Sequence, residues 1–423
     1  MEKTIRKENN LVSFMQAYLL SLGGLNQIMG IFLEKSDGIM VMNLIPLAAL
    51  MMLHFITSDK KRDLNMSKKG LLFVYYIVSV IVVYKYAFRH TTYSYTYALV
   101  YCFVPVYLSF YKVNVEKILK YMMLFSVLVL PISGEFFEKG GFYYETIGMS
   151  TTYNILPFVI AAALHFWYYK KNAGLLTWIG YAINIYYLIQ IVLYGNRGPL
   201  IALVAFGLLL LLHKAVSETR MNKNALRTMI VTILAGALLI YVINNFVDIL
   251  IAVDGWLDSF GIEINALTKS IHKLRKGDLS NGRNWILEYT LKGINEHYLV
   301  GNGISTILYN SNGAVMYPHN LFYQLWYDLG VVVSVPMFYL VGRAAYITIF
   351  KSNLRKDYSV IMILLFTISI PRLCFSTEFW TTIPFWFLIM YTISPNIYGM
   401  KDDEDELKDE VVEEETVGKH ENF

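Results

Sequence analysis

Long apolar segments recur along this chain of 423 residues. A helix needs roughly 20 mostly apolar residues to cross the hydrocarbon core of a bilayer. Segments that approach this criterion lie at residues 11–33, 39–57, 70–88, 93–111, 118–133, 151–169, 174–194, 198–213, 226–248, 328–350, 358–372 and 380–398. Only 16% of the residues are charged, whereas soluble domains carry about 25%. The sequence therefore predicts an all-α, polytopic membrane protein with about twelve transmembrane helices.

The distribution of lysine and arginine predicts the orientation, because cytoplasmic loops of membrane proteins carry an excess of these residues. Alternate connections are rich in them, with Lys60, Lys61, Arg62, Lys68, Lys69, Lys112, Lys117, Lys170, Lys171, Lys214, Arg220, Lys223, Lys351, Arg355 and Lys356. The N-terminal cations Lys3, Arg6 and Lys7 fall on the same side. We therefore expect both termini to be cytoplasmic.

The predicted spans divide the chain into four regions. Residues 1–250 hold the first nine helices, 251–327 form one large extracytoplasmic loop with short helices, and 328–398 hold the last three helices. A loop of this length is usually functional or disordered. Residues 399–423 form an acidic tail, which we expect to be disordered and cytoplasmic. The tail contains a DxD pattern used by metal-dependent sugar-nucleotide enzymes, but a block of like charge without an apolar frame is typical of a solvated end.

Within the large loop, the sequence predicts a short helix that begins near Ser280-Asn281 and runs through NGRNWILEYTLKGINE. The loop ends at YPHNLFYQLWYDLG. Residues 319–350 are too many for one upright span, so we expect Leu321 to Asp328 to lie along the membrane interface and the chain to turn inward at Gly330.

Besides the pair Arg89 and His90, three arginines are predicted on the outer side, against the general bias of cations. Arg197 lies in the turn-rich stretch GNRGPL, Arg283 in the first turn of the loop helix, and Arg372 after Pro371 at the outer end of a span. Each has a structural explanation, either as a side chain that reaches lipid headgroups or as an ordinary loop residue. An ionisable group near membrane depth is nevertheless a functional candidate by default. Together the arginines predict an anion site, with Arg283 at a helix N-terminus that favours phosphate.

His319 and Asn320 stand between the large loop and the next apolar segment. After Pro318, either residue suits a helix start, which is the structural interpretation. The alternative is a catalytic imidazole on the same face as the outer arginines, because a neutral imidazole near pH 7 accepts a proton readily. The residues alone leave both interpretations open.

Four pieces of sequence, in order, carry a resemblance to a known family. They are GNRGPLIAL, NGRNWILEYTLKGINEHYLVGNG, PHN and LFYQLWYDLG, and they lie between Tyr194 and about Leu340. The sequence resembles the superfamily of O-antigen polymerases and O-antigen ligases, which are bacterial inner-membrane proteins with about a dozen helices and one large periplasmic loop. The resemblance thus implies a GT-C-like membrane fold in the bacterial cytoplasmic membrane.

Two spacings bear on which branch the chain resembles. In the ligases, a His-Asn pair is followed after nine residues by Gly, as His319-Asn320 is here by Gly330, but Val333 stands where the ligases have Gly, Thr or Tyr. The polymerases have an Arg and a Gly separated by nine or ten residues in two outer loops. Similar pairs here are Arg197 with Gly207 and Arg283 with Gly293. The spacings favour a polymerase over a ligase.

The resemblance implies a metal-independent, inverting glycosyltransferase that needs no cofactor. Its donor would be an oligosaccharide on undecaprenyl diphosphate. The acceptor would be a second lipid-linked repeat unit for a polymerase of O-antigen or capsule, or lipid A core for a ligase. Arg197, Arg283 and Arg372 would bind the diphosphate, with Arg283 also catalytic. His319 would activate the acceptor hydroxyl and Asn320 would position it.

The resemblance also implies partners, namely membrane lipids, a chain-length regulator and a flippase. No basic patch with interleaved aromatics points to nucleic acid. A function of another class, transport of lipid-linked oligosaccharide by a flippase, stays open. Transporters often show matching halves, and residues 1–210 and 211–400 show no convincing match.

Overall fold

The structure, a computed structural model, describes residues 2–32, 36–57, 64–87, 92–143, 145–194, 197–221, 246–261, 267, 271, 284–351 and 356–398. This part of the chain is helical, and its only extended pairings are two isolated bridges, Leu64 with Tyr111 and Val113 with Ile397. The all-α prediction is therefore confirmed for the described residues.

The described helices overlap most of the predicted apolar segments, although the predicted span 380–398 overlaps only two short helices, Phe379–Thr381 and Ile383–Ile393. The described helices are α1 (Glu2–Phe32), α2 (Ser36–Thr57), α4 (Lys68–Ala87), α5 (Thr92–Leu108), α6 (Val115–Tyr143), α7 (Glu145–Tyr169), η1 (Lys170–Asn172), α8 (Leu175–Tyr194), α9 (Arg197–Met221), α11 (Phe246–Asp258), α13 (Asn284–Glu296), α14 (Ile307–Asn310), α15 (Leu321–Tyr346), η2 (Ile347–Lys351), α16 (Lys356–Phe375), η4 (Phe379–Thr381) and α17 (Ile383–Ile393). Most of the predicted segment 226–248 lies outside the described residues.

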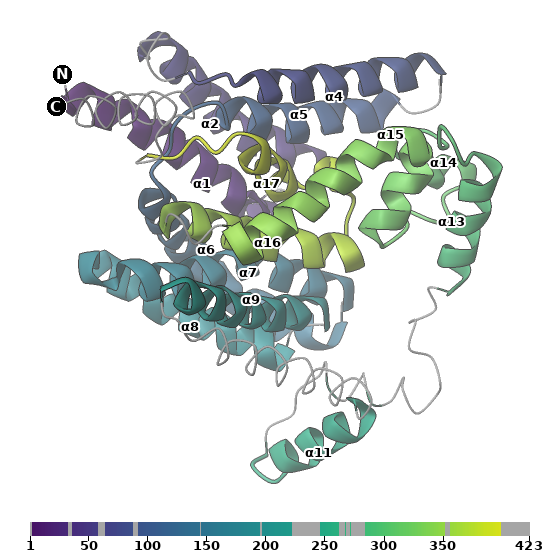
Figure 1. Cartoon of the computed structure of the whole chain (residues 1–423). Coiled ribbons are helices and arrows are strands. Elements are labelled where there is room, and N and C mark those ends of the chain that lie inside the picture. The colour runs from purple at the N-terminus through teal and green to yellow at the C-terminus, as the bar shows by residue number, and fades with distance from the viewer. Residues whose placement is uncertain are drawn as a thin grey trace, which may run out of the picture.

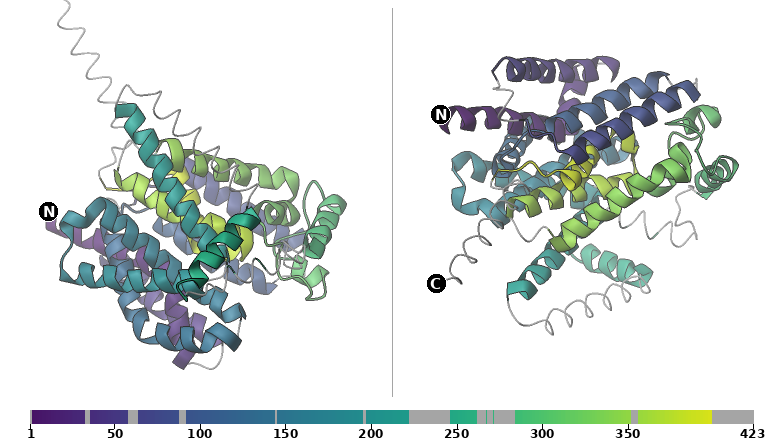
Figure 2. Two further views of the ribbon diagram at one scale, coloured as in Figure 1. Left: turned by 90° about the horizontal axis from the view of Figure 1, so that it is seen from below. Right: turned by 45° about the horizontal axis from the view of Figure 1, so that its top comes forward.

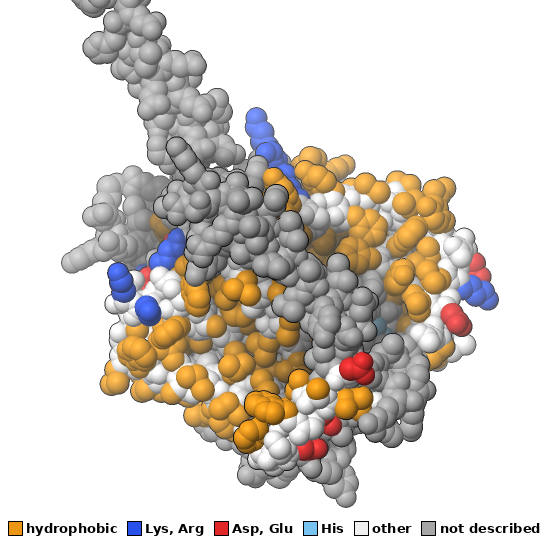
Figure 3. All heavy atoms as spheres, turned by 60° about the horizontal axis from the view of Figure 1, so that its bottom comes forward, with side chains coloured by type: hydrophobic (Ala, Val, Ile, Leu, Met, Phe, Trp, Pro, Cys, Tyr) orange, Lys and Arg blue, Asp and Glu red, His pale blue; other side chains and the backbone are white. Residues whose placement is uncertain are grey.

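Three of the described helical segments are long and apolar enough to cross a membrane by length and composition, namely Leu175–Val192, Leu321–Phe350 and Lys356–Phe375. Only 33% of the Leu175–Val192 window is buried inside the protein, so most of its apolar side chains face the surroundings. Figure 3 shows hydrophobic side chains over much of the described surface on one face. These findings agree with a helical membrane protein. The count of twelve spans and the sidedness stay predictions.

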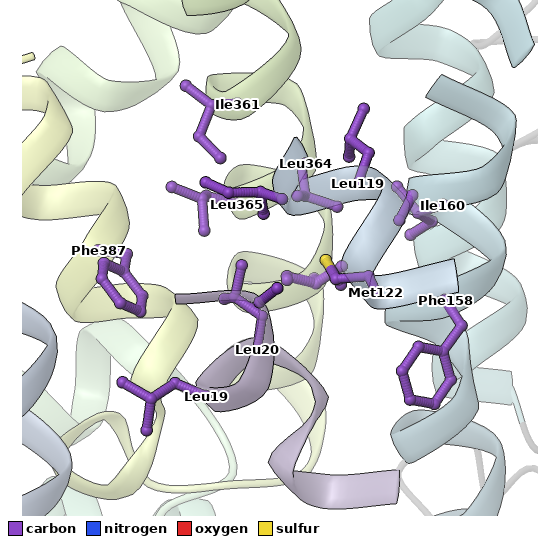
Figure 4. Close-up of a cluster of buried hydrophobic side chains, with 14 of the residues drawn as sticks. Leu19, Leu20, Leu119, Met122, Phe158, Ile160, Ile361, Leu364, Leu365 and Phe387 are labelled. Atoms are coloured by element: carbon purple, nitrogen blue, oxygen red, sulfur yellow. The ribbon is translucent and has the colours of Figure 1, made fainter. Parts of the chain in front are cut away.

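The main core lies where α1, α6, α7, α16 and α17 pack together (Figure 4). Leu20, Met122, Phe158, Leu364 and Phe387 meet there, each from a different one of these helices and each nearly or fully buried. In a membrane such helices associate through close packing rather than through exclusion of water. This core fixes α7 and α16 relative to each other, and these two helices carry much of the candidate site.

Small residues bring α1 close to α7. A Cβ added to Gly24 would lie 2.7 Å from Cε2 of Phe158, so only a glycine permits this approach. One turn further, Gln27 donates from Nε2 to the Thr151 hydroxyl at 3.0 Å. The close crossing places the polar end of α1 beside the beginning of α7.

The helix α15 is bent at Gly330, whose φ of 65° and ψ of 173° are not helical. At the bend, the backbones of Gly301 and Gly330 touch, and a Cβ on either glycine would overlap the other chain. The predicted loop helix exists as α13, although its expected start at Ser280-Asn281 lies outside the described residues. Figures 1 and 2 show α13 and α14 gathered around the first half of α15.

Candidate functional site

His319 has an unusual backbone conformation at the start of α15. Its φ is 56°, in the left-handed region that costs an L residue roughly 1–2 kcal/mol. The next residue, Asn320, is the N-cap of α15, and its Oδ1 accepts from the backbone N–H groups of Phe322 and Tyr323. Capping therefore explains an Asn at position 320, whereas it does not explain a strained His at position 319.

The His319 ring is held from two sides. Its centroid lies 4.2 Å from that of Tyr317, and its Nδ1 lies 3.3 Å from the carbonyl oxygen of Phe375 at the end of α16. Because a carbonyl oxygen can only accept, Nδ1 carries the proton in this hydrogen bond. In the neutral ring, Nε2 is then the nitrogen that can accept a proton.

Arg372 lies on the same turn of α16 that holds His319. The backbone carbonyl of Arg372 accepts from Ser376 at 2.8 Å, and the carbonyl of Ser376 accepts from the Tyr317 hydroxyl at 2.6 Å. The guanidinium of Arg372 stands 5.4 Å from the ring centroid of Tyr153 on α7, in a cation–π contact. The structure thus brings two of the predicted site residues together at one helix end.

A cavity of about 570 Å³ opens beside Arg372, between α1, α7, α16 and η4. Its lining includes the polar side chains of Asn26, Gln27, Tyr101, Asn154, Arg372, Thr377, Thr381 and Thr382. Its apolar lining includes Leu19, Leu20, Leu22, Ile368, Ile383 and Pro384. Amides and hydroxyls next to one guanidinium suit a ligand that is both hydroxyl-rich and anionic. The aliphatic side chains suit an attached hydrocarbon.

The first turn of α9 approaches the same place. A Cβ on Gly198 would overlap the hydroxyl oxygen of Tyr153, so the α9 backbone lies against the hydroxyl end of the ring that faces Arg372. Arg197 is the first residue of α9, and its side chain lies outside what the structure describes. The backbone of Arg197 is therefore next to Gly198 and close to the cavity lining.

The third predicted diphosphate ligand is Arg283. Arg283 lies outside the described residues, one position before Asn284, where α13 begins. Gly293 on this helix packs directly on the Tyr327 ring of α15, which ties α13 to the first half of α15. Gly207, by contrast, has open space where a Cβ would stand. Of the two glycines that follow Arg197 and Arg283 at the polymerase-like spacing, Gly293 is thus closely packed and Gly207 is not.

A buried carboxyl group near the site was not predicted from the sequence. Glu378 follows Thr377 of the cavity, and its Oε2 accepts from the Ser305 hydroxyl at 3.2 Å. Burial raises the pKa of the Glu378 carboxyl to about 7, and the hydrogen bond from Ser305 opposes this shift. Glu378 is near enough to Asp328 to act on it electrostatically, and Asp328 accepts from Trp380 Nε1 at 3.2 Å. These contacts join residues 301–306 to α15 and η4.

The amide side chains of the cavity were also missed. Asn26 and Gln27 lie in the first predicted span and Asn154 in the sixth, so their signal is a polar side chain inside an apolar segment. Thr377, Thr381 and Thr382 carry no such signal, because threonine is common at helix ends.

Comparisons with known proteins identify no family for this chain. No protein-family model matches it, and a search of curated proteins gives no significant match.

Proposed function

We propose that this protein is a membrane-embedded, metal-independent glycosyltransferase that polymerises undecaprenyl-diphosphate-linked oligosaccharide repeat units into O-antigen or capsule. The reaction would take place on the outer face of the bacterial cytoplasmic membrane. The observation that carries this proposal is the attachment of His319 to the turn of α16 that bears Arg372, beside a polar cavity. The sequence resemblance to O-antigen polymerases supports the same assignment.

In the proposed reaction, the acceptor hydroxyl oxygen attacks the anomeric carbon of the donor. The bond from that carbon to the diphosphate oxygen breaks, and its electron pair leaves with undecaprenyl diphosphate. The hydroxyl proton passes to Nε2 of His319, because Nδ1 already donates to Phe375. In this proposal Arg372, together with Arg197 and Arg283, stabilises the leaving diphosphate without a metal ion. A single displacement of this kind inverts the anomeric configuration.

The cavity lining suits the two parts of such a donor. Sugar hydroxyls need many neutral donors and acceptors, which Asn26, Asn154 and the threonines provide. A polyprenyl chain needs an aliphatic surface, and Leu19 and Ile383 provide part of one in the cavity lining. An anionic link between them needs a fixed cation, and Arg372 lies in the same lining.

The test is reconstitution of the purified protein into liposomes with a lipid-diphosphate oligosaccharide. Longer lipid-linked chains, formed with a chelator present, are the expected product. Transfer only to added lipid A core would identify a ligase instead. Movement of the lipid across the bilayer without a new glycosidic bond would identify a flippase and refute the proposal. Retained anomeric configuration would refute the single displacement.

A matched pair of arginine variants sharpens this test. Arg372→Ala should lower the rate of chain growth by about 100-fold or more, as loss of a charge-stabilising donor does. Arg343→Ala removes an arginine from the exposed side of α15, where its Nη1 contacts the Tyr339 hydroxyl at 3.4 Å, and should leave the rate unchanged. Equal effects of both substitutions would exclude a specific role for Arg372.

A further inference from the structure

A second basic site lies at the opposite end of α16 from Arg372. It surrounds the start of α6, where a cavity of about 300 Å³ is lined by Asn114, Glu116, Lys117, Lys120 and Tyr121. The two sites are well separated, since Lys356 and Arg372 lie sixteen residues apart on one helix, or about 24 Å at the usual rise per residue. Lys356 belongs to the lysine end, because its Nζ stands 3.7 Å from the ring centroid of Tyr169, next to η1.

Lysines from two connections converge around this cavity. The hydrogen bond from Asn172 Nδ2 to Glu116 Oε2, at 3.0 Å, brings η1 beside the first turn of α6. The lysines of this cluster are Lys112, Lys117, Lys120, Lys170 and Lys171. Two acids lie among the described residues at this end: Glu116 is paired with Lys120 at 2.6 Å, and Asp357 accepts from the Tyr169 hydroxyl at 2.5 Å. The cluster therefore keeps an excess of positive charge, and Lys170 and Lys171 are exposed.

The described chain ends beside this cluster. The carbonyl of Asn396 accepts from Val113 N at 3.2 Å, and Tyr398 N donates to the carbonyl of Val113 at 3.0 Å. Tyr398 is thus fixed next to the residue that precedes Asn114 of the cavity. Lys117 lies one helical turn further on, about 6 Å along α6. Figure 1 shows the yellow end of the ribbon on the same side of the bundle as the start of α1.

The chain that follows is strongly acidic. Residues 401–415, KDDEDELKDEVVEEE, contain ten acidic residues and two lysines, a net charge of −8, and begin three residues after Tyr398. This segment lies outside the described residues. Fifteen extended residues reach up to about 50 Å, so the segment can contact every lysine of the cluster.

We propose that the acidic segment 401–415 binds the lysine cluster at the start of α6 in the same molecule. The tether holds the segment at a millimolar effective concentration, which favours it over ligands from solution. Its charge complements that of the cluster, and exposed charge pairs of this kind weaken as salt rises. Anionic lipid headgroups have the same chemistry and would compete for the lysines. This interaction does not depend on the proposed function.

Photocrosslinking of the full-length chain tests the interaction. Benzoylphenylalanine replaces Tyr121, which lines the cavity, or in a second variant the exposed Lys171, and the crosslinked peptides are mapped by mass spectrometry in liposomes of phosphatidylcholine alone. We expect both probes to capture peptides from residues 401–415, with a yield that falls at least fivefold in 1 M salt. A probe at the exposed Tyr309 of α14 is the matched control and should not capture them.

Charge substitutions complete the test. Lys117→Gln with Lys120→Gln should lower tail capture by the Lys171 probe several-fold, whereas Lys292→Gln on the exposed side of α13 should not. Capture of other segments only, or capture that persists unchanged in 1 M salt, would overturn the proposal. If added phosphatidylglycerol abolishes tail capture completely at low salt, the occupant is a lipid headgroup and the proposal fails.

Discussion

His319 donates from Nδ1 to the carbonyl oxygen of Phe375, 3.3 Å away, and this contact fixes the imidazole to the end of α16. The backbone of His319 is left-handed, so the ring is held in place at a conformational cost. The start of α15 does not require a histidine at position 319, because Asn320 already caps the helix. Helix capping alone therefore does not account for the conformational cost. Backbone strain of this kind is typical of functional residues.

The first prediction concerns His319→Gly, which separates strain from chemistry. Glycine adopts positive φ without penalty, and this gain offsets the lost Nδ1 hydrogen bond of about 1 kcal/mol. The free energy of unfolding of the variant should therefore lie within about 1 kcal/mol of that of the natural protein. Its rate of chain growth should fall at least about 100-fold, because the proton acceptor is absent.

Thermal unfolding in detergent and the liposome assay measure the two properties. The matched control is His297→Ala, an exposed histidine beyond the end of α13, which should change neither. A glycine variant that polymerises at the natural rate would show that His319 is only structural.

The second prediction concerns Tyr317→Phe. This change removes the hydroxyl that donates to Ser376 at 2.6 Å but keeps the ring beside His319. Stability should fall by about 1 kcal/mol, and the rate should fall by about tenfold, because the imidazole is less precisely held. Tyr298→Phe is the control, since the ring contact of Tyr298 with Trp326 remains. An unchanged rate in a less stable Tyr317→Phe protein would mean that the hydroxyl does not position the site.

The third prediction concerns Gly198→Ala at the start of α9. The new methyl group would overlap the Tyr153 hydroxyl and must displace either the ring or the helix end. Overpacking of this kind costs about 1–3 kcal/mol, and it moves the ring that faces Arg372. The rate of chain growth should fall even under conditions in which the variant stays fully folded. Gly207→Ala lies on the same helix with nothing within 4 Å of the new methyl group, so it should be neutral in both assays.

The sequence predicts the helices well because hydropathy is a strong local signal. The segments around Leu20, Phe158 and Leu364 are apolar over a whole span, and each forms a helix of the core. The bend at Gly330 was also expected from length alone, but its cause is a tertiary contact with Gly301. Hydropathy cannot show which helices pack side by side, and so it cannot show that α7 and α16 form one wall of the cavity.

For the site, the sequence identifies residues by type but not by surroundings. Arg372 and His319 were predicted from their unusual positions, and the turn of α16 that bears Arg372 also provides the Phe375 carbonyl that His319 contacts. Tyr153 and Tyr317, which join them, were not predicted, because nothing distinguishes them among 33 tyrosines. Glu378 was missed because its hydrogen-bond partner, Ser305, is distant in sequence.

The fourth prediction concerns the pH dependence that Glu378 imposes on stability. Its folded-state pKa of about 7 lies above the ordinary value of 4.5, so the folded protein holds this proton more tightly than the unfolded chain does. The stabilisation is therefore complete below pH 4.5 and is lost as the pH rises through 7. Its full size is about 3 kcal/mol, from 1.36 kcal/mol for each unit of pKa difference.

Glu378→Gln keeps the size of the side chain and its contact with Ser305 but cannot ionise. The variant should lose this part of the pH dependence between pH 5 and 7.5, and it should be the more stable protein at pH 8, where the natural carboxyl is charged beside Asp328. Free energies of unfolding at several pH values measure the effect. Glu288→Gln on exposed α13 is the control and should leave the natural curve unchanged. Parallel curves for the natural protein and Glu378→Gln would mean that Glu378 is ionised throughout this range in the folded protein. Hydrogen bonds from Ser305 and its neighbours would then stabilise the charged carboxylate more than burial destabilises it.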